Sequence, residues 1–172
     1  MKTNVETGSG KNSFLTFRLG QEQFAVHVNN VLNFLEPSGF AKVPKSPDEN
    51  RGVINLRGTV LPIIDMKFKM GMPPVEITAD TCIIVMVIPM KSEKIYVGGL
   101  VDKVESVHEI DSRDIRSAPE HTKGMGNGFL RDIAKVNEEF VLIIDAEKII
   151  SEKEVLNHPE LGKYAVNKRQ LS

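Results

Sequence analysis

The chain has 172 residues, 41% hydrophobic and 26% charged, a composition typical of a globular protein with one domain or two small lobes. Its 22 basic and 23 acidic residues leave a net charge of -1, so no overall positive field favours nucleic acid or an anionic membrane as a partner. The longest apolar run, residues 82–88, is far shorter than the roughly 20 residues that span a bilayer, so we expect no direct membrane insertion.

The N-terminal segment is polar and built from small residues. Residues 1–12 are predicted to form a flexible tail, because they carry too few apolar groups to offset the entropy of ordering. They also lack the basic start and apolar core of a signal peptide. Cys82 is the only cysteine, so no intramolecular disulfide can form and the chain fits a reducing cytoplasm.

Short runs rich in Val, Ile and Phe dominate the chain from residue 14 onward. They are separated by Gly, Pro, Asn and Asp, which favour turn conformations. The pattern predicts an all-β fold of barrels or a sandwich. The nine runs of strand length are 14–19, 24–28, 52–56, 60–64, 82–88, 95–101, 104–110, 129–136 and 140–144.

Helical patterns occur in two places. The apolar positions of residues 28–34 fit a helical turn, although a curved strand would also fit. The second is clearer: Asp145 can cap a short amphipathic helix over residues 146–156, in which apolar residues alternate with charged ones. We expect residues 153–172 to form the end of this helix and a frayed tail.

Parts of the sequence repeat weakly. Val28, Val31 and Phe34 have the spacing of Val101, Val104 and Val107, and the pair Leu56-Arg57 recurs as Leu130-Arg131. The run from Val60 to Asp65 also resembles the run from Val141 to Asp145. These matches indicate two similar halves, although apolar strands can also match by chance.

The sequence offers no convincing catalytic or metal centre. His27, His108, His121 and His158 show no pair at ligand spacing and no companion cysteine cluster, so no metal site is predicted. Cys82 lies inside the most apolar run, where a structural thiol is favoured over a nucleophile. A triad of His27, an aspartate and a serine lacks the Gly-x-Ser-x-Gly elbow.

Two further motifs also have structural interpretations. The Gly-rich stretch 124–128 lacks the Lys-Ser/Thr ending of a phosphate-binding loop and indicates a flexible loop. Asp65 and Asp145 each close an Ile-Ile pair, and their shared context indicates duplicated turns or caps rather than paired acid and base. We therefore expect no enzyme activity and no cofactor.

The segment 55–58 is a first candidate for a binding site. Asn55-Leu56-Arg57-Gly58 lies between two strand runs, and Gly58 permits a tight turn that would aim Arg57 outward. A solvated hairpin arginine with no partner is the alternative.

The run Gly-Val-Ile-Asn-Leu-Arg-Gly-Thr-Val-Leu-Pro-Ile-Ile-Asp over residues 52–65 resembles the signature of the CheW family of chemotaxis coupling proteins. Residues 14–20 and 24–31 resemble the family's first two strands, and Val43-Pro44-x-x-Pro47 resembles the lead into the signature. In the second half the similar segments are 98–107, Ala118-Pro119 and 141–149. The resemblance covers about residues 13–152, a CheW-like domain of two β-barrel lobes.

This resemblance implies two side-by-side five-stranded SH3-like β-barrels with a short C-terminal helix. It implies a non-enzymatic adaptor that couples chemoreceptors to a CheA-type histidine kinase, recruited from the cytoplasm to membrane-associated receptor arrays. A groove between the barrels would receive a receptor's cytoplasmic helical hairpin. The positions that match it are Val31, Asn33, Phe34, Arg57, Val104 and Val107. A second surface, on the first barrel near Gly52 and Gly58, would contact the regulatory domain of the kinase.

One position departs from the family pattern. Asn33 stands where the family commonly has Glu, and Phe34 follows it, so a carboxylate beside the groove is lost and receptor choice could differ. Two alternative functions remain open: a CheW-like scaffold in another sensory pathway, such as surface motility or development, and a small-molecule-binding β-barrel, which would need a deep pocket with convergent polar groups.

Overall fold

The computed structural model describes residues 11–37, 50–90, 93–119 and 128–149. Within these ranges the chain is mostly β, with one four-residue α-helix and three short 3-10 helices. None of the described helices is long and apolar enough to cross a membrane. The strands are β1 Lys11–Leu19, β2 Glu22–His27, β3 Val31–Leu35, β4 Asn50–Leu56, β5 Thr59–Asp65, β6 Cys82–Met90, β7 Glu93–Val101, β8 Lys103–Asp111, β9 Ile115–Ser117, β10 Leu130–Val136 and β11 Glu139–Ile144.

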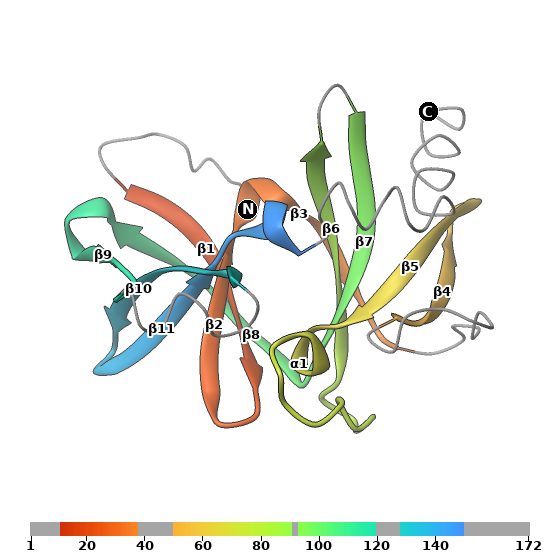
Figure 1. Ribbon diagram of the computed structural model, residues 1–172, viewed down its shortest axis with the longest axis horizontal. Coiled ribbons are helices and arrows are strands. Elements are labelled where there is room, and N and C mark those ends of the chain that lie inside the picture. The colour runs from red at the N-terminus through yellow and green to blue at the C-terminus, as the bar shows by residue number, and fades with distance from the viewer. Residues whose placement is uncertain (1–10, 38–49, 91–92, 120–127, 150–172) are drawn as a thin grey trace.

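The strands form two sheets that lie side by side (Figure 1). One sheet has the order β8-β1-β2-β11-β10-β9 and is called here the β1 lobe; the other has the order β3-β6-β7-β5-β4 and is called the β6 lobe. Most pairs are antiparallel, but β11 pairs with β2 and β5 pairs with β7 in parallel. The predicted all-β fold of two lobes is confirmed, and a three-residue strand, β9, adds a sixth strand to one of them.

All nine predicted strand runs are strands. The ambiguous segment at residues 28–34 divides into a 3-10 helix, Val28–Asn30, and strand β3. At the N-terminus β1 begins at Lys11, inside the predicted tail, and residues 1–10 lie outside the described ranges. Asp145 does cap a 3-10 helix, Ala146–Lys148, but the rest of the predicted C-terminal helix lies outside the described residues.

Each lobe takes strands from both halves of the sequence. The N-terminal repeat, β1 to β5, gives its hairpin β1–β2 to the β1 lobe and its remaining strands to the β6 lobe. The C-terminal repeat, β6 to β11, does the reverse, with β6–β7 in the β6 lobe. Strands β3 and β8 are therefore the two points where the chain crosses from one lobe to the other.

The strand registers show that the repeat is real. On β3 a bulge between Val31 and Asn33 places two residues opposite one step of β6, and β8 has the same bulge between Val104 and Ser106 where it pairs with β1. A shared irregularity at one position is a stronger mark of duplication than shared apolar residues, because bulges re-aim the side chains beside them. The predicted equivalence of Val31 with Val104 is consistent with both registers.

The register also corrects one predicted match. The bulge of β4 lies between Asn50 and Gly52, and the bulge of β10 lies between Leu130 and Asp132. Arg131 is therefore equivalent to Arg51, and the expected equivalence of Arg57 with Arg131 was wrong. The hairpin turn that holds Arg57 corresponds instead to residues 137–138.

The main hydrophobic core is shared by the two lobes. It includes Phe17 and Phe24 from the β1 lobe with Met66, Ile84 and Met86 from the β6 lobe. Two smaller clusters fill the separate lobes, one around Phe14 and Ile143 and the other around Ile63 and Leu100. Because one core joins both sheets, the lobes are expected to unfold together.

Candidate functional site

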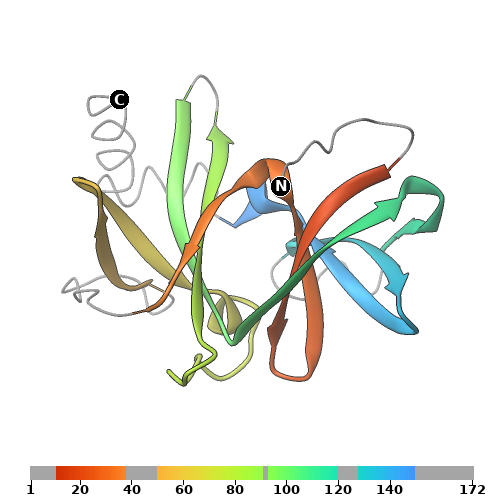
Figure 2. The same ribbon diagram turned by 180° about the vertical axis from the view of Figure 1, so that it is seen from behind.

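The candidate site is built on the two crossing strands. β3 and β8 both cross the face of the molecule that is turned toward the viewer in Figure 2, and each forms an edge of its sheet. The pairing partners of β3 and β8 along the sheets are β6 and β1. The two bulged edge strands therefore present equivalent residues on one side of the protein.

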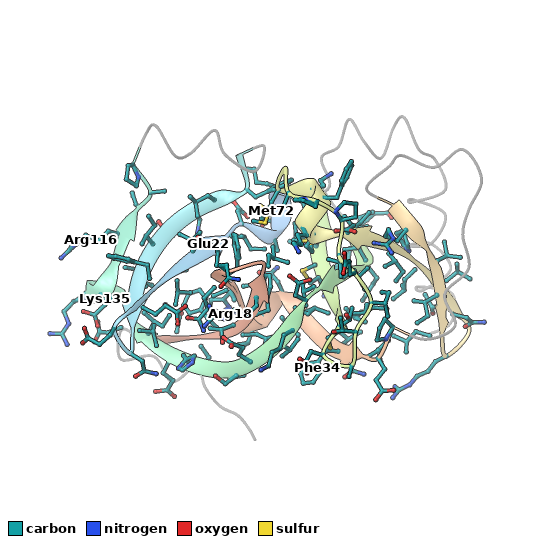
Figure 3. The ribbon with its side chains drawn as sticks, turned by 90° about the horizontal axis from the view of Figure 1, so that it is seen from below. Arg18, Glu22, Phe34, Met72, Arg116 and Lys135 are labelled. Carbon is teal, nitrogen blue, oxygen red and sulfur yellow. The ribbon has the colours of Figure 1, made fainter. Side chains whose placement is uncertain are left out.

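The predicted groove residues divide into an inner and an outer pair. Val31 and Val104 are half-buried, and both pack against the main core that the lobes share. Phe34 and Val107 are 51% and 57% exposed. In Figure 3 Phe34 lies at the lower edge of the picture, between the two sheets. The inner valines anchor the strands, and the outer residues are the ones a partner could reach.

Leu32 belongs to the same surface, although the sequence analysis did not select it. It is the extra residue of the β3 bulge and is 50% exposed. Leu32 and Phe34 thus both leave large apolar side chains exposed on β3. The sequence pattern did not distinguish Leu32 from its apolar neighbours. Its exposure is seen only in the structure.

The equivalent bulge residue of β8 is Glu105, whose carboxylate accepts two hydrogen bonds. Glu105 accepts hydrogen bonds from Arg18 Nε at 3.1 Å and from Gln23 Nε2 at 2.8 Å. Arg18 also binds Glu139 through both terminal nitrogens, at 2.6 and 2.9 Å. Its hydrogen bonds to Glu139 and Glu105 raise the pKa of the Arg18 guanidinium above its usual value. β8 is thus fixed to its lobe by ion pairs where β3 exposes a leucine.

Asn33, the position that departs from the family pattern, is exposed. Its side-chain Oδ1 accepts a hydrogen bond from the Phe34 N–H at 2.8 Å. The Asn33 side-chain oxygen is therefore engaged by the backbone of the next residue.

Arg57 is exposed in the two-residue turn between β4 and β5, with φ 56°. Among the described residues it has no hydrogen bond or ion pair. β4 and β3 are the two ends of the strand order in the β6 lobe, so the placement of Arg57 at the groove edge stays a prediction.

The two glycines predicted near the kinase surface differ in exposure. Gly52 is buried at the β4 bulge, with φ 142°, so it shapes the strand and offers little surface of its own. Gly58 is exposed in the β4–β5 turn with φ 85°, a left-handed conformation that glycine adopts without strain. Its N–H donates to Asn55 Oδ1 at 2.8 Å.

A second exposed aromatic lies at the far end of the β1 lobe. Phe140 is 64% exposed, and the Lys135 ammonium lies 5.9 Å from its ring centroid. Both line an open hollow of about 530 Å³ together with Arg116, Asp114 and residues of β9 and β10. Arg116 and Lys135 project outward at this end in Figure 3. The sequence analysis missed this surface, because Phe140 lies in a strand run that reads as core.

The predicted chemical candidates take structural roles. Asp65 and Asp145 both cap short helices through their carboxylates, as their shared context predicts. Cys82 is half-buried against the main core, and burial raises the pKa of its thiol, which disfavours the nucleophilic thiolate. Among the described residues, no group of three His, Cys, Asp or Glu side chains could hold a metal ion.

Comparisons with known proteins identify similar sequences and a similar fold. A CheW-like domain model matches residues 13–154. The chain is 34% identical to the "Probable chemotaxis protein CheW" of Rhizobium etli over 84% of this chain and 91% of that protein. It is 30% identical to chemotaxis protein CheW of Klebsiella aerogenes, over 83% of each. The crystal structure of the scaffolding protein TtCheW from Thermoanaerobacter tengcongensis superposes with a TM-score of 0.74 at 26% identity, covering 83% of this chain and 94% of that one.

Proposed function

The chain belongs to the CheW-like family of chemotaxis scaffold proteins, and on that premise we propose that it is an adaptor that couples chemoreceptors to a CheA-type histidine kinase. It would work in the cytoplasm at membrane-associated receptor arrays and carry out no chemical step. The observation that carries the proposal is the pair of equivalent bulged strands that present apolar side chains on one face.

The receptor surface would consist of Leu32, Phe34 and Val107, supported from beneath by Val31 and Val104. An amphipathic helix places apolar residues along one side, so an exposed apolar strip fits the helical hairpin of a receptor. Asn33 and Arg57 would flank the strip and set the register. A few well-packed side chains near the centre of an interface commonly carry most of the binding energy, which makes the aromatic Phe34 the first residue to test.

The kinase regulatory domain would bind elsewhere. Two places compete for it: the β4–β5 turn at Gly58, which the sequence analysis favoured, and the surface around Phe140 on the β1 lobe. The Phe140 surface has the stronger support, because an exposed aromatic beside Lys135 and Arg116 offers both apolar area and charge.

The experiment measures binding of each variant to a receptor hairpin fragment and, separately, to the regulatory domain of a CheA-type kinase. Phe34→Ala and Val107→Ala should weaken only the receptor complex, and Phe140→Ser only the kinase complex, each by about 1–3 kcal/mol if the side chain is central. Gly58→Asn keeps a left-handed turn accessible and adds a side chain, so it tests the turn. A wild-type chain that binds neither partner would refute the adaptor function.

Arg57→Ala has its own prediction. A rim ion pair is worth about 0–1 kcal/mol, whereas truncating a desolvated partner costs about 2–5 kcal/mol. A loss of receptor affinity above roughly tenfold at an unchanged melting temperature would place Arg57 inside the interface, since 1.4 kcal/mol is tenfold. Arg131→Ala is the matched control, and normal binding by Arg57→Ala would remove it from the site.

The same measurements address the alternatives. Binding to receptors of another sensory system, with no binding to chemotaxis receptors, would favour a scaffold for surface motility or development. The small-molecule alternative needs a deep pocket with convergent polar groups, whereas the hollow beside Phe140 is open.

A further inference from the structure

Asp102 occupies the point where the chain passes between lobes. It is the one residue between the end of β7 at Val101 and the start of β8 at Lys103. β7 belongs to the β6 lobe and β8 to the β1 lobe. The direction in which β8 leaves this point sets where Val104 and Val107 lie relative to β3.

The Asp102 side chain joins the two lobes. Its Oδ2 accepts a hydrogen bond from the Gly20 N–H at 2.7 Å, in the β1–β2 turn of the β1 lobe. The same oxygen lies 3.4 Å from Lys67 Nζ, on helix α1 (Met66–Lys69), which follows β5 of the β6 lobe. The Asp102 N–H donates to Arg18 O at 3.1 Å. One residue thus holds both lobes and the crossing backbone.

The β1–β2 turn lies close to residues that follow β5. Gly20 has φ 65°, and a Cβ there would lie 3.8 Å from Met72 Sδ and 3.9 Å from Lys67 Cε. A small side chain at position 20 would thus contact Met72 and Lys67 in the segment that follows β5. Met72 lies near the meeting of the two lobes in Figure 3. Lys69 adds a second link, with its ammonium 5.6 Å from the ring of Phe129, just before β10.

The other crossing point is held differently. Between β2 and β3, Asn30 Nδ2 donates to Val87 O at 3.1 Å, and His27 Nδ1 accepts from the Asn29 N–H at 3.0 Å. The repeat spacing places Asn29, which is exposed, at the position of Asp102. Of the two crossings, only the β7–β8 crossing has a carboxylate that binds a cation on one lobe and an N–H on the other among the described residues.

We propose that Asp102, with Lys67, is a positioning pair that fixes the angle between the lobes and so the separation of the apolar strips on β3 and β8. The inference rests on the proposed receptor function for its consequence, but not for its structural content. Hydrogen bonds to a charged group are stronger than those between neutral groups, and the Asp102 carboxylate accepts one from the Gly20 N–H. Because Asp102 lies where β8 begins, a small rotation there would move the whole strand. The lobe angle would then be a determinant of receptor affinity.

The test separates these two parts. In a Cys82→Ala background, spin labels at Lys94→Cys on the β6 lobe and Ser117→Cys on the β1 lobe report the distance between lobes, independently of any receptor. Asp102→Ala should broaden this distance distribution, and Lys67→Met should do so less, because the Gly20 hydrogen bond remains. Glu138→Gln, which removes the 3.8 Å pair with Lys135 inside one lobe, is the matched control and should leave the distribution unchanged.

Receptor-fragment affinity is measured on the same variants without labels. Asp102→Ala should lose roughly 2- to 30-fold, the range for residues that act through a coupled element, and Asp102→Asn should recover part of the loss by still accepting from Gly20. An unchanged distance distribution would overturn the positioning role. A broadened distribution with unchanged affinity would overturn its link to binding. If the parent protein binds no receptor fragment, the proposed function fails while the distance measurement still decides the role of Asp102.

Discussion

The two equivalent hairpins, β4–β5 and β10–β11, share one plan and differ in how they use it. Both have the same bulge, a two-residue turn with positive φ, and an aspartate that caps the next helix. Asp65 is fully buried and accepts from Arg51 Nη1 at 2.7 Å, Phe68 N at 2.9 Å and Val75 N at 3.0 Å. Duplication has kept the backbone features, whereas the buried ion pair is found in only one copy.

The equivalent residues in the other hairpin are less constrained. Asp145 is half-buried and accepts from the Glu147 N–H at 3.0 Å, and Arg131 pairs with its neighbour Asp132 at 2.8 Å. The Asp65 network also fixes the segment that leads to Val75, which includes α1 and the contact with Asp102. The hairpin β4–β5 is therefore fixed by more buried contacts than its counterpart β10–β11.

The largest predicted effect separates the two aspartates. Asp65→Ala should lower the free energy of unfolding by about 3–5 kcal/mol, because it leaves Arg51 and two backbone N–H groups without their acceptor. Asp145→Ala should cost only about 0.5–2 kcal/mol, the usual value of a helix cap. Denaturant unfolding measures both. If Asp65→Ala does not fold, Asp65→Asn replaces it, and equal losses at the two positions would contradict the comparison.

Arg51 and Arg131 give the second pair. Arg51→Met should destabilise by about 1–3 kcal/mol, since the buried Asp65 carboxylate would keep only its two backbone donors. Arg131→Met should change stability by about 0–1 kcal/mol, as expected for an exposed pair. Thermal and urea unfolding of both variants provide the measurement. A loss at Arg131 as large as that at Arg51 would mean that its neighbours depend on it in a way the described contacts do not include.

The sequence predicted local features well, because they depend on neighbouring residues. Runs of β-branched residues between turn formers predicted nine of the eleven described strands, and the Ile-Ile-Asp context predicted both caps. It could not predict that β3 and β8 change lobes, since the alternation of a strand does not say which sheet it joins. The match of Arg57 with Arg131 failed for a related reason: residue identity in a short run is a weaker guide than pairing register.

The candidate site was predicted in outline and missed in detail. Val31 and Val104 were identified as equivalent by their spacing, but their burial and the exposure of Leu32 both depend on the bulge. Phe140 gave no signal, because its exposure is decided by how β11 lies at the end of the β1 lobe. Strand β9, of only three residues with Arg and Ser, was too short and polar to recognise.

The turns offer a third and smaller test, with opposite signs in the two copies. Gly58 has φ 85°, and its counterpart Glu138 has φ 68° without the freedom of glycine. Gly58→Ala should destabilise by about 1 kcal/mol, and Glu138→Gly should be stabilising by less than that, because the left-handed conformation costs a non-glycine residue about 1–2 kcal/mol while glycine adds unfolded-state entropy. Unfolding in denaturant gives both values. Two changes of the same sign would show that the turns are not equivalent.

The smallest expected effect concerns pH at the other crossing point, where His27 takes part instead of a carboxylate. Burial first, and the positive charge of Arg131 second, lower the pKa of His27 below its usual 6.5. A histidine with a depressed pKa binds fewer protons folded than unfolded, so its contribution to stability is present above pH 6.5 and is lost as the pH falls below that value. Protonation would also remove the acceptor that Nδ1 offers to the Asn29 N–H.

NMR titration of the His27 ring should give a midpoint below 6.5, and His27→Gln should reduce the decline in stability between pH 7 and 5. Because the side chain is only partly buried, the change should be smaller than any of the three above. A midpoint at or above 6.5, or an unchanged pH dependence in His27→Gln, would mean that this crossing is held without the neutral imidazole, and the contrast with the charged contact at Asp102 would have to be abandoned.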